Sequence, residues 1–231
     1  MTTSCYLIEE FDKIENLTWY PWIGNNFEMQ NSKLLLIGES HYAEDPEDNS
    51  DKKCYNDFLN NKRTTIGFIE DLDVKDKILG GNTWRFYENT YRALFRTNYI
   101  DVKKFWSKVA FYNFIQRPMK SKDERPIVSD YTNSFIVFTN LIKKLNVTHC
   151  IFLGNSAQRH LYKIIQADKS LNIIEEEDEQ IGKYWAYKRK ISIGNRIITI
   201  YFIKHPSKYF SWEKWNEYLE RNENVLIDEL R

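Results

Sequence analysis

The chain has few cysteines, and their placement excludes two kinds of stabilised fold. Its 231 residues include Cys5, Cys54 and Cys150, which are far apart, odd in number and without any paired spacing. This pattern argues against a disulfide framework and against a zinc or iron–sulfur site built from cysteines alone. We therefore expect reduced thiols. The four histidines show no metal-ligand spacing either, and we expect no metal site.

Long apolar runs are also missing. None approaches the roughly 20 residues of a membrane span, and the first residues lead into Glu9 and Glu10 rather than into the apolar centre of a signal peptide. We therefore expect a cytoplasmic protein that does not enter a membrane. The chain is 42% hydrophobic, and it has no repeat, no Pro-rich or Ser-rich linker and no shift in composition. Residues 1–231 are predicted to form a single domain.

An excess of charge of either sign is lacking too. The chain carries 33 basic and 33 acidic residues, so its total charge gives no support to a nucleic-acid partner. The distribution is uneven, because no acidic residue lies within 102–122 or 181–212, and both tracts carry basic and aromatic residues. A positive face with stacking side chains is typical of DNA or RNA binders. The alternative is a solvated surface of mixed charge, balanced by the acidic run 175–179.

Strand-like and helix-like segments alternate along the chain. Alternation of this kind implies crossover connections and a mainly parallel sheet. Residues 171–190 are hard to place and are interpreted as an irregular insert. Loops are expected at 43–53, 80–82 and 119–129. Four apolar runs are predicted as strands, at 33–37, 109–114, 148–153 and 196–203, and helices are predicted at 83–95, after Asp130, from Ser156 to Ile165 and at 212–230.

Each predicted strand ends in a glycine or a polar residue. The strand ends carry Gly38-Glu39, Asn113, Gly154-Asn155 and His205. In neighbouring parallel strands, these side chains would converge on one edge of the sheet, where open α/β sheets bind ligands. A carboxylate, a carboxamide and an imidazole suit hydrolysis of a bond to a heterocycle. Taken singly, such residues are more often surface charges, turn formers or loop residues.

Other chemistries fit the strand ends less well. The turn at Gly38 lacks the spacing and the Lys-Ser/Thr ending of a phosphate-binding loop, and 154–156 is too short for a dinucleotide fingerprint. Ser40 is a possible nucleophile, but the second glycine of a nucleophile elbow is missing. Metal-dependent and serine hydrolases are therefore set aside.

Four short motifs, in order, resemble those of the uracil-DNA glycosylase superfamily. Gly38-Glu39-Ser40-His41-Tyr42 is similar to the first motif, and His205-Pro206-Ser207 is similar to the last. Between them lie 112–118, followed by Arg125-Pro126, and the strand-glycine-helix step at 152–157. The resemblance implies a three-layer α/β/α sandwich around a central, mainly parallel four-stranded sheet. It also implies no cofactor, a DNA partner and hydrolysis of an N-glycosidic bond that leaves an abasic site; we expect a monomer.

The resemblance also implies roles for individual residues. Glu39 would position or activate water, Asn113 would hydrogen-bond the flipped base, and His205 would stabilise the departing base. The base pocket would include Gly38, Ser40, Tyr42 and a stacking aromatic, which is Phe86 or, as the alternative, Trp84. The residues expected to contact DNA are Ser207, Lys208, Tyr209, Phe210, Arg117, Asn155 and Ser156.

Several functions remain open from the sequence. The excised base would be uracil or another deaminated base, or else a modified cytosine of the phage type, which would imply antiviral defence. Ser40 stands where the best-studied uracil enzymes have an aspartate, and this difference permits the modified base. The rivals are a non-catalytic nucleic-acid-binding module on the same fold and a hydrolase of free nucleosides.

Overall fold

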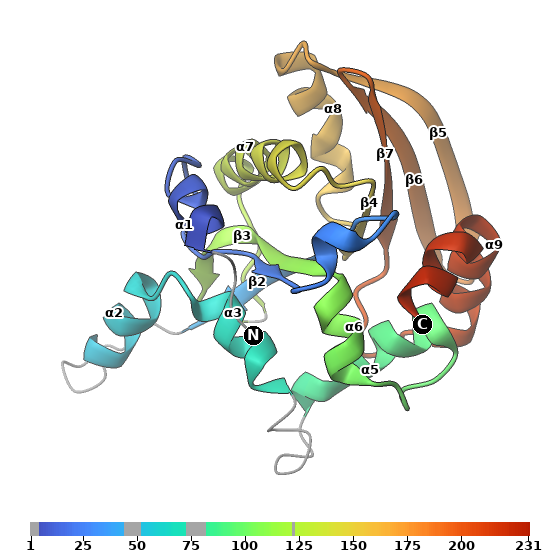
Figure 1. Cartoon of the computed structure of the whole chain (residues 1–231), viewed down its shortest axis with the longest axis horizontal. Coiled ribbons are helices and arrows are strands. Elements are labelled where there is room, and N and C mark those ends of the chain that lie inside the picture. The colour runs from blue at the N-terminus through green and yellow to red at the C-terminus, as the bar shows by residue number, and fades with distance from the viewer. Residues whose placement is uncertain (1–4, 44–51, 73–81, 122) are drawn as a thin grey trace.

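A mixed β-sheet runs through the centre of the molecule, and helices lie against both of its faces (Figure 1). The computed structural model describes residues 5–43, 52–72, 82–121 and 123–231. Within these residues the sheet has seven strands in the order β1-β3-β2-β4-β7-β6-β5. The strands are β1 (Trp22–Ile23), β2 (Leu34–Tyr42), β3 (Ala110–Met119), β4 (His149–Leu153), β5 (Leu171–Ile181), β6 (Tyr184–Ile193) and β7 (Arg196–Ile203).

The centre of the sheet is a block of parallel strands. β3, β2, β4 and β7 pair in that order, and they contain the four apolar runs predicted as strands. The predicted ends at residues 37 and 114 are wrong, because β2 continues to Tyr42 and β3 to Met119, so that Glu39 and Asn113 lie inside strands. Their apolar runs are continuous because helices cover both faces, so that successive side chains are all buried. One row across the block joins Ile37, Phe152 and Phe202 in register. All four carboxyl ends therefore point to the same edge of the sheet.

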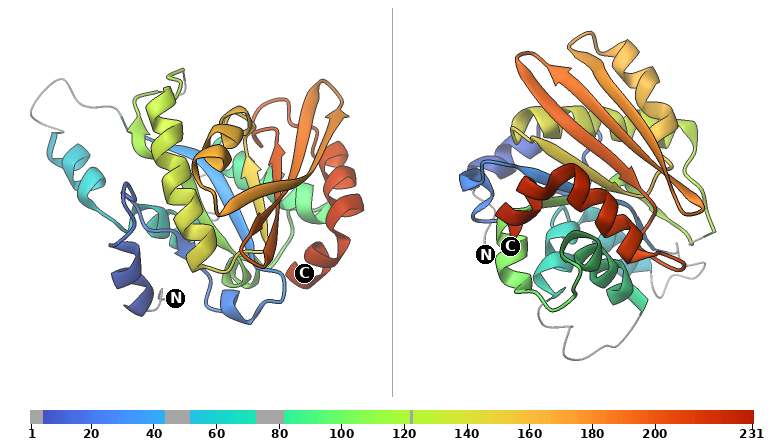
Figure 2. Two further views of the ribbon diagram at one scale, coloured as in Figure 1. Left: turned by 90° about the horizontal axis from the view of Figure 1, so that it is seen from above. Right: turned by 90° about the vertical axis from the view of Figure 1, so that its right-hand side faces the viewer.

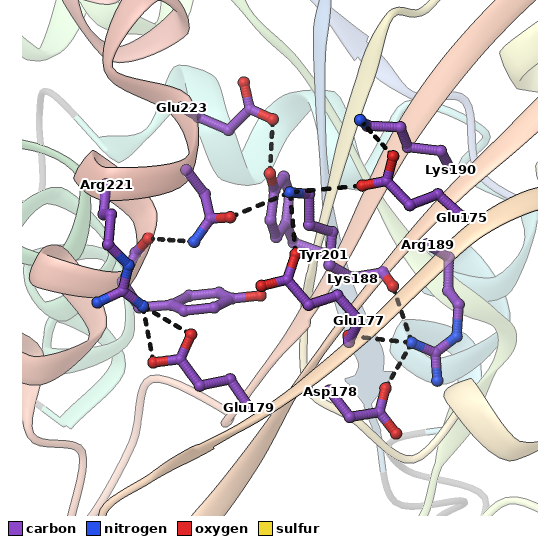
Figure 3. A network of polar contacts seen from close by, with 12 residues as sticks. Glu175, Glu177, Asp178, Glu179, Lys188, Arg189, Lys190, Tyr201, Arg221 and Glu223 are labelled. Atoms are coloured by element: carbon purple, nitrogen blue, oxygen red, sulfur yellow. Dashed lines mark hydrogen bonds and ion pairs between the residues drawn. The ribbon is translucent and has the colours of Figure 1, made fainter.

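The expectation of a four-stranded, mainly parallel sheet is wrong. In the described part of the chain, antiparallel strands extend the parallel block at both ends: β1 pairs with β3, β6 with β7, and β5 with β6. The segment interpreted as an irregular insert forms most of the β5–β6 hairpin. β5 carries an acidic run and β6 a basic run in place of apolar residues, and cross-strand ion pairs such as Glu175–Lys190 and Glu177–Lys188 join them (Figure 3).

Two groups of helices cover the sheet (Figures 1 and 2). On one face, α1 lies beside α7, where Lys144 forms an ion pair with Glu10. On the other face α9 packs on α5, and Asn216 donates a hydrogen bond to the Ala93 carbonyl at 3.2 Å. The helices are α1 (Cys5–Phe11), α2 (Lys52–Asn60), α3 (Thr64–Glu70), α5 (Asn82–Phe95), α6 (Val102–Lys108), α7 (Val128–Lys144), α8 (Gln158–Ala167) and α9 (Trp212–Leu230), with a short 3-10 helix at Phe27–Met29.

The helix predictions hold with small shifts at the ends. The terminal helix α9 has the predicted bounds, and α5 begins one residue early. Asp130 lies inside the first turn of α7, where its carboxylate accepts a hydrogen bond from the Ile127 amide at 2.9 Å. The predicted loop at 119–129 runs between β3 and α7. Most of the loops predicted at 43–53 and 80–82 lies outside the described residues.

Aromatic side chains fill the core between the sheet and α7. Phe152 stacks on Phe202 of β7 with ring centroids 4.5 Å apart, and it also contacts Phe138 of α7 at 5.4 Å. Phe114 of β3 packs edge-on against Phe135 of α7 at 4.9 Å. This packing fixes the carboxyl ends of the central strands, where the candidate site lies. Among the described helices, none has the length and apolarity that crossing a membrane requires.

Candidate functional site

A shallow pocket opens where β4 ends, beside the inner parts of β2 and β3. These two strands bring Glu39 and Ile115 together with the Gly154–Ser156 turn, which leads into α8. Phenylalanines of the core form its floor, so the pocket combines an apolar base with a polar rim. The residues that line it are Ile37, Gly38, Glu39, Phe114, Ile115, Phe152, Leu153, Gly154, Ser156 and Ala157.

Glu39 is held in this pocket by the turn that follows β4. The Ser156 hydroxyl donates a hydrogen bond to Glu39 Oε1 at 3.0 Å. Gly154 has a φ of +156°, a conformation that residues with a Cβ rarely adopt, and it turns the chain so that Ser156 meets the carboxylate while Asn155 stays exposed. The other oxygen of Glu39 has no hydrogen-bond partner among the described residues. The carboxylate is therefore half-buried, oriented and able to accept a further hydrogen bond.

Asn113 lies on the opposite face of the sheet from Glu39. It pairs with Gly38, and alternation along a strand places Gly38 and Glu39 on different faces. A Cβ at position 38 would collide with Asn113 Oδ1, so glycine is required for the side chain to lie there. The carboxamide is buried and makes no hydrogen bond within the described part of the chain. It can therefore present one donor and one acceptor to a ligand.

His205 follows the end of β7 and is held against α5. Its imidazole contacts the Phe86 ring, with centroids 5.1 Å apart. The buried Asn89 side chain, also on α5, donates a hydrogen bond to the Pro206 carbonyl at 3.2 Å and so fixes the loop that carries the histidine. Burial lowers the pKa of His205, the Lys204 charge lowers it further, and the nearby Glu39 carboxylate raises it in part. The imidazole is therefore neutral near pH 7.

These contacts define what the structure brings together. Glu39 and Ser156 lie on one side of the sheet edge, and Asn113 lies on the other with Gly38. His205 interacts with groups on both sides: the Glu39 carboxylate raises its pKa, and its ring contacts Phe86. The predicted trio thus shares one edge without sharing one face. The alternation of side chains along β2 could have predicted which residues lie on each face of the sheet. Nothing in the sequence indicated that Asn89 anchors the loop after β7.

The rest of the first motif divides between the site and the core. Ser40 is half-buried, pairs with Ile115 and shares the face of Asn113. His41 belongs to the core, where its Nε2 lies 2.9 Å from the Thr65 hydroxyl. Burial lowers the pKa of His41 to about 4. Tyr42 is 46% exposed and pairs with Met119 beyond a bulge in the β2–β3 pairing, and it is not among the residues that line the pocket.

The residues expected to contact DNA also divide into two groups. Tyr209 is 88% exposed, and Lys208 is exposed beside it. Phe210 instead packs into the core, with its ring stacked on Trp215 at 5.9 Å. Arg117 is engaged within the molecule, since it binds Asp130 and Glu124 at 2.8 Å each. Phe210 is therefore buried away from any phosphate backbone, and Arg117 remains at the surface with its charge compensated by two carboxylates.

Three further predicted residues have simple positions. Ser207 is half-buried in the loop after His205, and its amide donates to the His205 carbonyl at 2.8 Å. Phe86 is half-buried on α5, toward the site. The Trp84 side chain lies outside the described residues. Between the two aromatic candidates for stacking on a base, the observed contact with His205 favours Phe86.

The chain was also compared with known proteins. No model of a known protein family matches it, and no curated protein matches it. Among the described residues, no group of three or more His, Cys, Asp or Glu side chains could hold a metal ion. The chemistry of the site is thus interpreted from Glu39, Asn113 and His205 and from their surroundings.

Proposed function

We propose that the protein is a monofunctional DNA glycosylase on a uracil-DNA glycosylase-like α/β/α fold. It would flip a base out of DNA and hydrolyse its N-glycosidic bond, leaving an abasic site. The observation that carries the proposal is the grouping of an oriented carboxylate, an unengaged carboxamide and a neutral imidazole at one edge of the parallel strands. An enzyme with a pocket at this edge must extrude the nucleotide, because a stacked base is out of reach.

Each group has a role in the proposed reaction. Cleavage proceeds through a sugar with oxocarbenium character, which the negative charge of Glu39 stabilises while its free oxygen orients water. The neutral imidazole of His205 donates a hydrogen bond to the oxygen of the departing base. Asn113 pairs with the base edge, and Phe86 offers its ring for stacking. The exposed Lys208-Tyr209 segment faces the DNA.

Two substrates are consistent with this site. Repair of uracil or another deaminated base needs a small pocket, whereas a modified cytosine needs room for its substituent. Ser40 is small and half-buried, and it stands where the uracil enzymes have an aspartate. This difference in the first motif permits the modified cytosine and, with it, a role in antiviral defence.

The proposal is tested by measuring base release from DNA. Duplex and single-stranded oligonucleotides containing uracil or a modified cytosine, and phage DNA, are incubated with the protein. Abasic sites are then detected by alkaline cleavage, and the free base by mass spectrometry. We expect Glu39→Gln and His205→Ala each to lower the excision rate by about 100-fold or more, the usual effect of removing one preorganised electrostatic contact.

Matched controls separate chemistry from folding. Glu175→Gln removes a carboxylate from the exposed strand β5 and should leave excision unchanged. Circular dichroism and thermal melting check that each variant folds. Full activity of both site variants would refute the assignment.

A non-catalytic DNA-binding module is the second candidate. It is favoured by the shallow pocket and by the Asn113 carboxamide, which lies over Gly38, where a bound base would need space. Binding of DNA with no free base released from any substrate would support this candidate. Release of base from free nucleosides, insensitive to salt, would instead indicate a nucleoside hydrolase.

A further inference from the structure

The tip of the β5–β6 hairpin lies beside the candidate site. The hairpin turns at Gly182-Lys183, and Ile181 pairs with Tyr184. β6 is in register with β7 through the pair Tyr187–Phe202, so residues 184 and 185 lie next to the segment that follows β7. A direct contact confirms this position, since Lys204 Nζ lies over the Tyr184 ring at 4.7 Å.

Strand register places Trp185 on the same face of the sheet as Glu39. A continuous row of paired residues crosses β2, β4, β7 and β6, and its members are Ile37, Phe152, Phe202 and Tyr187. Glu39 on β2 and Trp185 on β6 each lie two residues closer to the carboxyl edge than the member of the row on their own strand, so they share its face. Neighbouring strands are ~4.8 Å apart, so three strand spacings separate the Glu39 and Trp185 positions by roughly 14 Å.

The Trp185 side chain presents an exposed aromatic ring. It is 47% exposed and has no ring, cation or hydrogen-bond partner among the described residues. Tyr184 beside it is 37% exposed. Lys204 joins the tip to the loop after His205, because its ammonium also donates to the Lys208 carbonyl at 2.9 Å. The hairpin tip and the loop are therefore joined through Lys204 on the Tyr184 face of β6, and Trp185 lies on the other face of the same tip. Together they form one surface around the edge of the sheet, with exposed aromatic rings and lysines.

The charge of this surface is positive. No acidic residue lies within 181–212, while Lys183 and Lys208 are exposed. The nearest acid on β5, Glu179, is paired with Arg221 on α9 at 2.6 Å (Figure 3). Exposed aromatic rings among lysines are the chemistry that binds single-stranded nucleic acid, through base stacking and phosphate contacts. Duplex DNA hides its base faces, so stacking on Trp185 requires an unpaired nucleotide.

We propose that the hairpin tip binds an unpaired nucleotide of the DNA strand whose neighbouring nucleotide occupies the candidate site. The base stacks on Trp185, and Lys204 and Lys183 neutralise the adjacent phosphates. The strand then runs along the sheet edge from Glu39 toward the tip. The placement of the strand rests on the proposed glycosylase function, whereas the binding surface stands on its own contacts.

The experiment measures fluorescence anisotropy of a labelled single-stranded DNA and of its duplex. Trp185→Ala should weaken single-strand binding by on the order of ten-fold, the usual effect of losing one base–aromatic stack, and should leave duplex binding little changed. Trp185→Phe should retain most of the affinity. Tyr99→Ala is the matched control, because Tyr99 is 91% exposed and lies on the α5–α6 connection rather than on the tip.

The outcomes separate this inference from the proposed function. Unchanged single-strand binding in Trp185→Ala overturns it, as does an equal loss for the duplex or in the Tyr99→Ala control, or a preference for RNA. If no substrate yields free base but Trp185→Ala still loses single-strand affinity, the surface stands without the glycosylase. If the wild-type protein excises a base and Trp185→Ala binds and excises equally well, the glycosylase stands without the surface.

Discussion

At the scale of single residues, the buried His41 and the half-buried His205 have different surroundings. His41 is enclosed by Thr65, Trp19 and Phe68, and burial is the sole resolved cause of its lowered pKa. His205 is also desolvated, but the Glu39 carboxylate acts on it in the opposite direction. The first histidine is a packing residue, whereas the second is coupled to a group that can act on a ligand.

The coupling predicts the effect of Glu39→Gln on His205. Because the carboxylate favours the imidazolium, its removal should lower the pKa of His205 further. An NMR titration of the imidazole carbon-bound protons in the two proteins measures the shift. Glu175→Gln, on β5, should leave that titration unchanged. An unaltered His205 pKa in Glu39→Gln would show that the two groups are independent.

His41 predicts how stability depends on pH. Its pKa of about 4 in the folded protein is below the 6.5 of an unperturbed histidine, so the unfolded chain binds the proton more tightly. The contribution of His41 is full above pH 6.5 and is lost as the pH falls toward 4. Between pH 7.5 and 5 the loss is about 2 kcal/mol.

Urea denaturation at both pH values measures this loss. In His41→Gln, the unfolding free energy should fall by about 2 kcal/mol less between these two pH values than in the wild-type protein, since the titrating group is gone. Equal pH dependence in the two proteins would contradict the assignment of the effect to His41.

At the scale of elements, the two kinds of strand were unequally predictable. Leu34–Ile37 is apolar because both faces of β2 are buried, and such runs indicate strands without further knowledge. β5 contains five consecutive acidic residues at 175–179, which by themselves indicate a solvated tract. They become a strand only through pairing with the basic β6, and Arg189 is 2% exposed in that pairing. A local sequence pattern does not show that a distant basic segment will pair with the acidic one.

The site shows the same division. The position of His205 just after β7 followed from the sequence, whereas Glu39 and Asn113 lie inside β2 and β3, because both strands continue beyond the apolar runs that predicted them. The burial of Phe210 against Trp215 and the ion pairs of Arg117 depend on contacts with α9 and α7. A short sequence motif does not specify contacts with distant helices.

Two glycines in different elements predict opposite effects of the same substitution. Gly38→Ala on β2 would drive a methyl group into Asn113 Oδ1, so we expect a loss of about 1–3 kcal/mol in unfolding free energy and impaired excision. Gly67 lies in the helix α3, and a Cβ there meets nothing within 4 Å. Gly67→Ala should therefore gain about 0.5–1 kcal/mol, as for an unhindered helix position. Urea denaturation measures both, and equal effects would contradict the packing of Asn113 over Gly38.

At the scale of the whole molecule, a net charge of +0 conceals a separation of charge. The acidic residues of β5 pair largely with lysines and arginines of β6 and α9 (Figure 3). Within the part of the chain that the structure describes, Lys183 at the hairpin tip and Lys208 in the loop after β7 have no acidic partner. Total charge is therefore a poor guide to the partner of this chain. The acid-free tract 181–212 is the better guide, because residues distant within it meet at one edge of the sheet.

The separation of charge predicts how binding responds to salt. The logarithm of DNA affinity should fall linearly with the logarithm of salt concentration, because bound lysines release counterions. Lys183→Gln, at the hairpin tip, should reduce the slope by about one. Lys169→Gln, an exposed lysine at the far end of the same hairpin, should leave the slope unchanged. Equal slopes in all three proteins would exclude the tip from the contact with DNA.

The two edges of the sheet have a consequence for the behaviour of the protein in concentrated solution. An open edge offers unpaired backbone groups to any other strand and so promotes aggregation. Here one edge, β1, is two residues long, and the other, β5, carries the acidic run 175–179. A short edge and a charged edge both oppose the addition of a foreign strand. The acidic residues that prevented the prediction of β5 thus also oppose aggregation of the folded protein through this edge of the sheet.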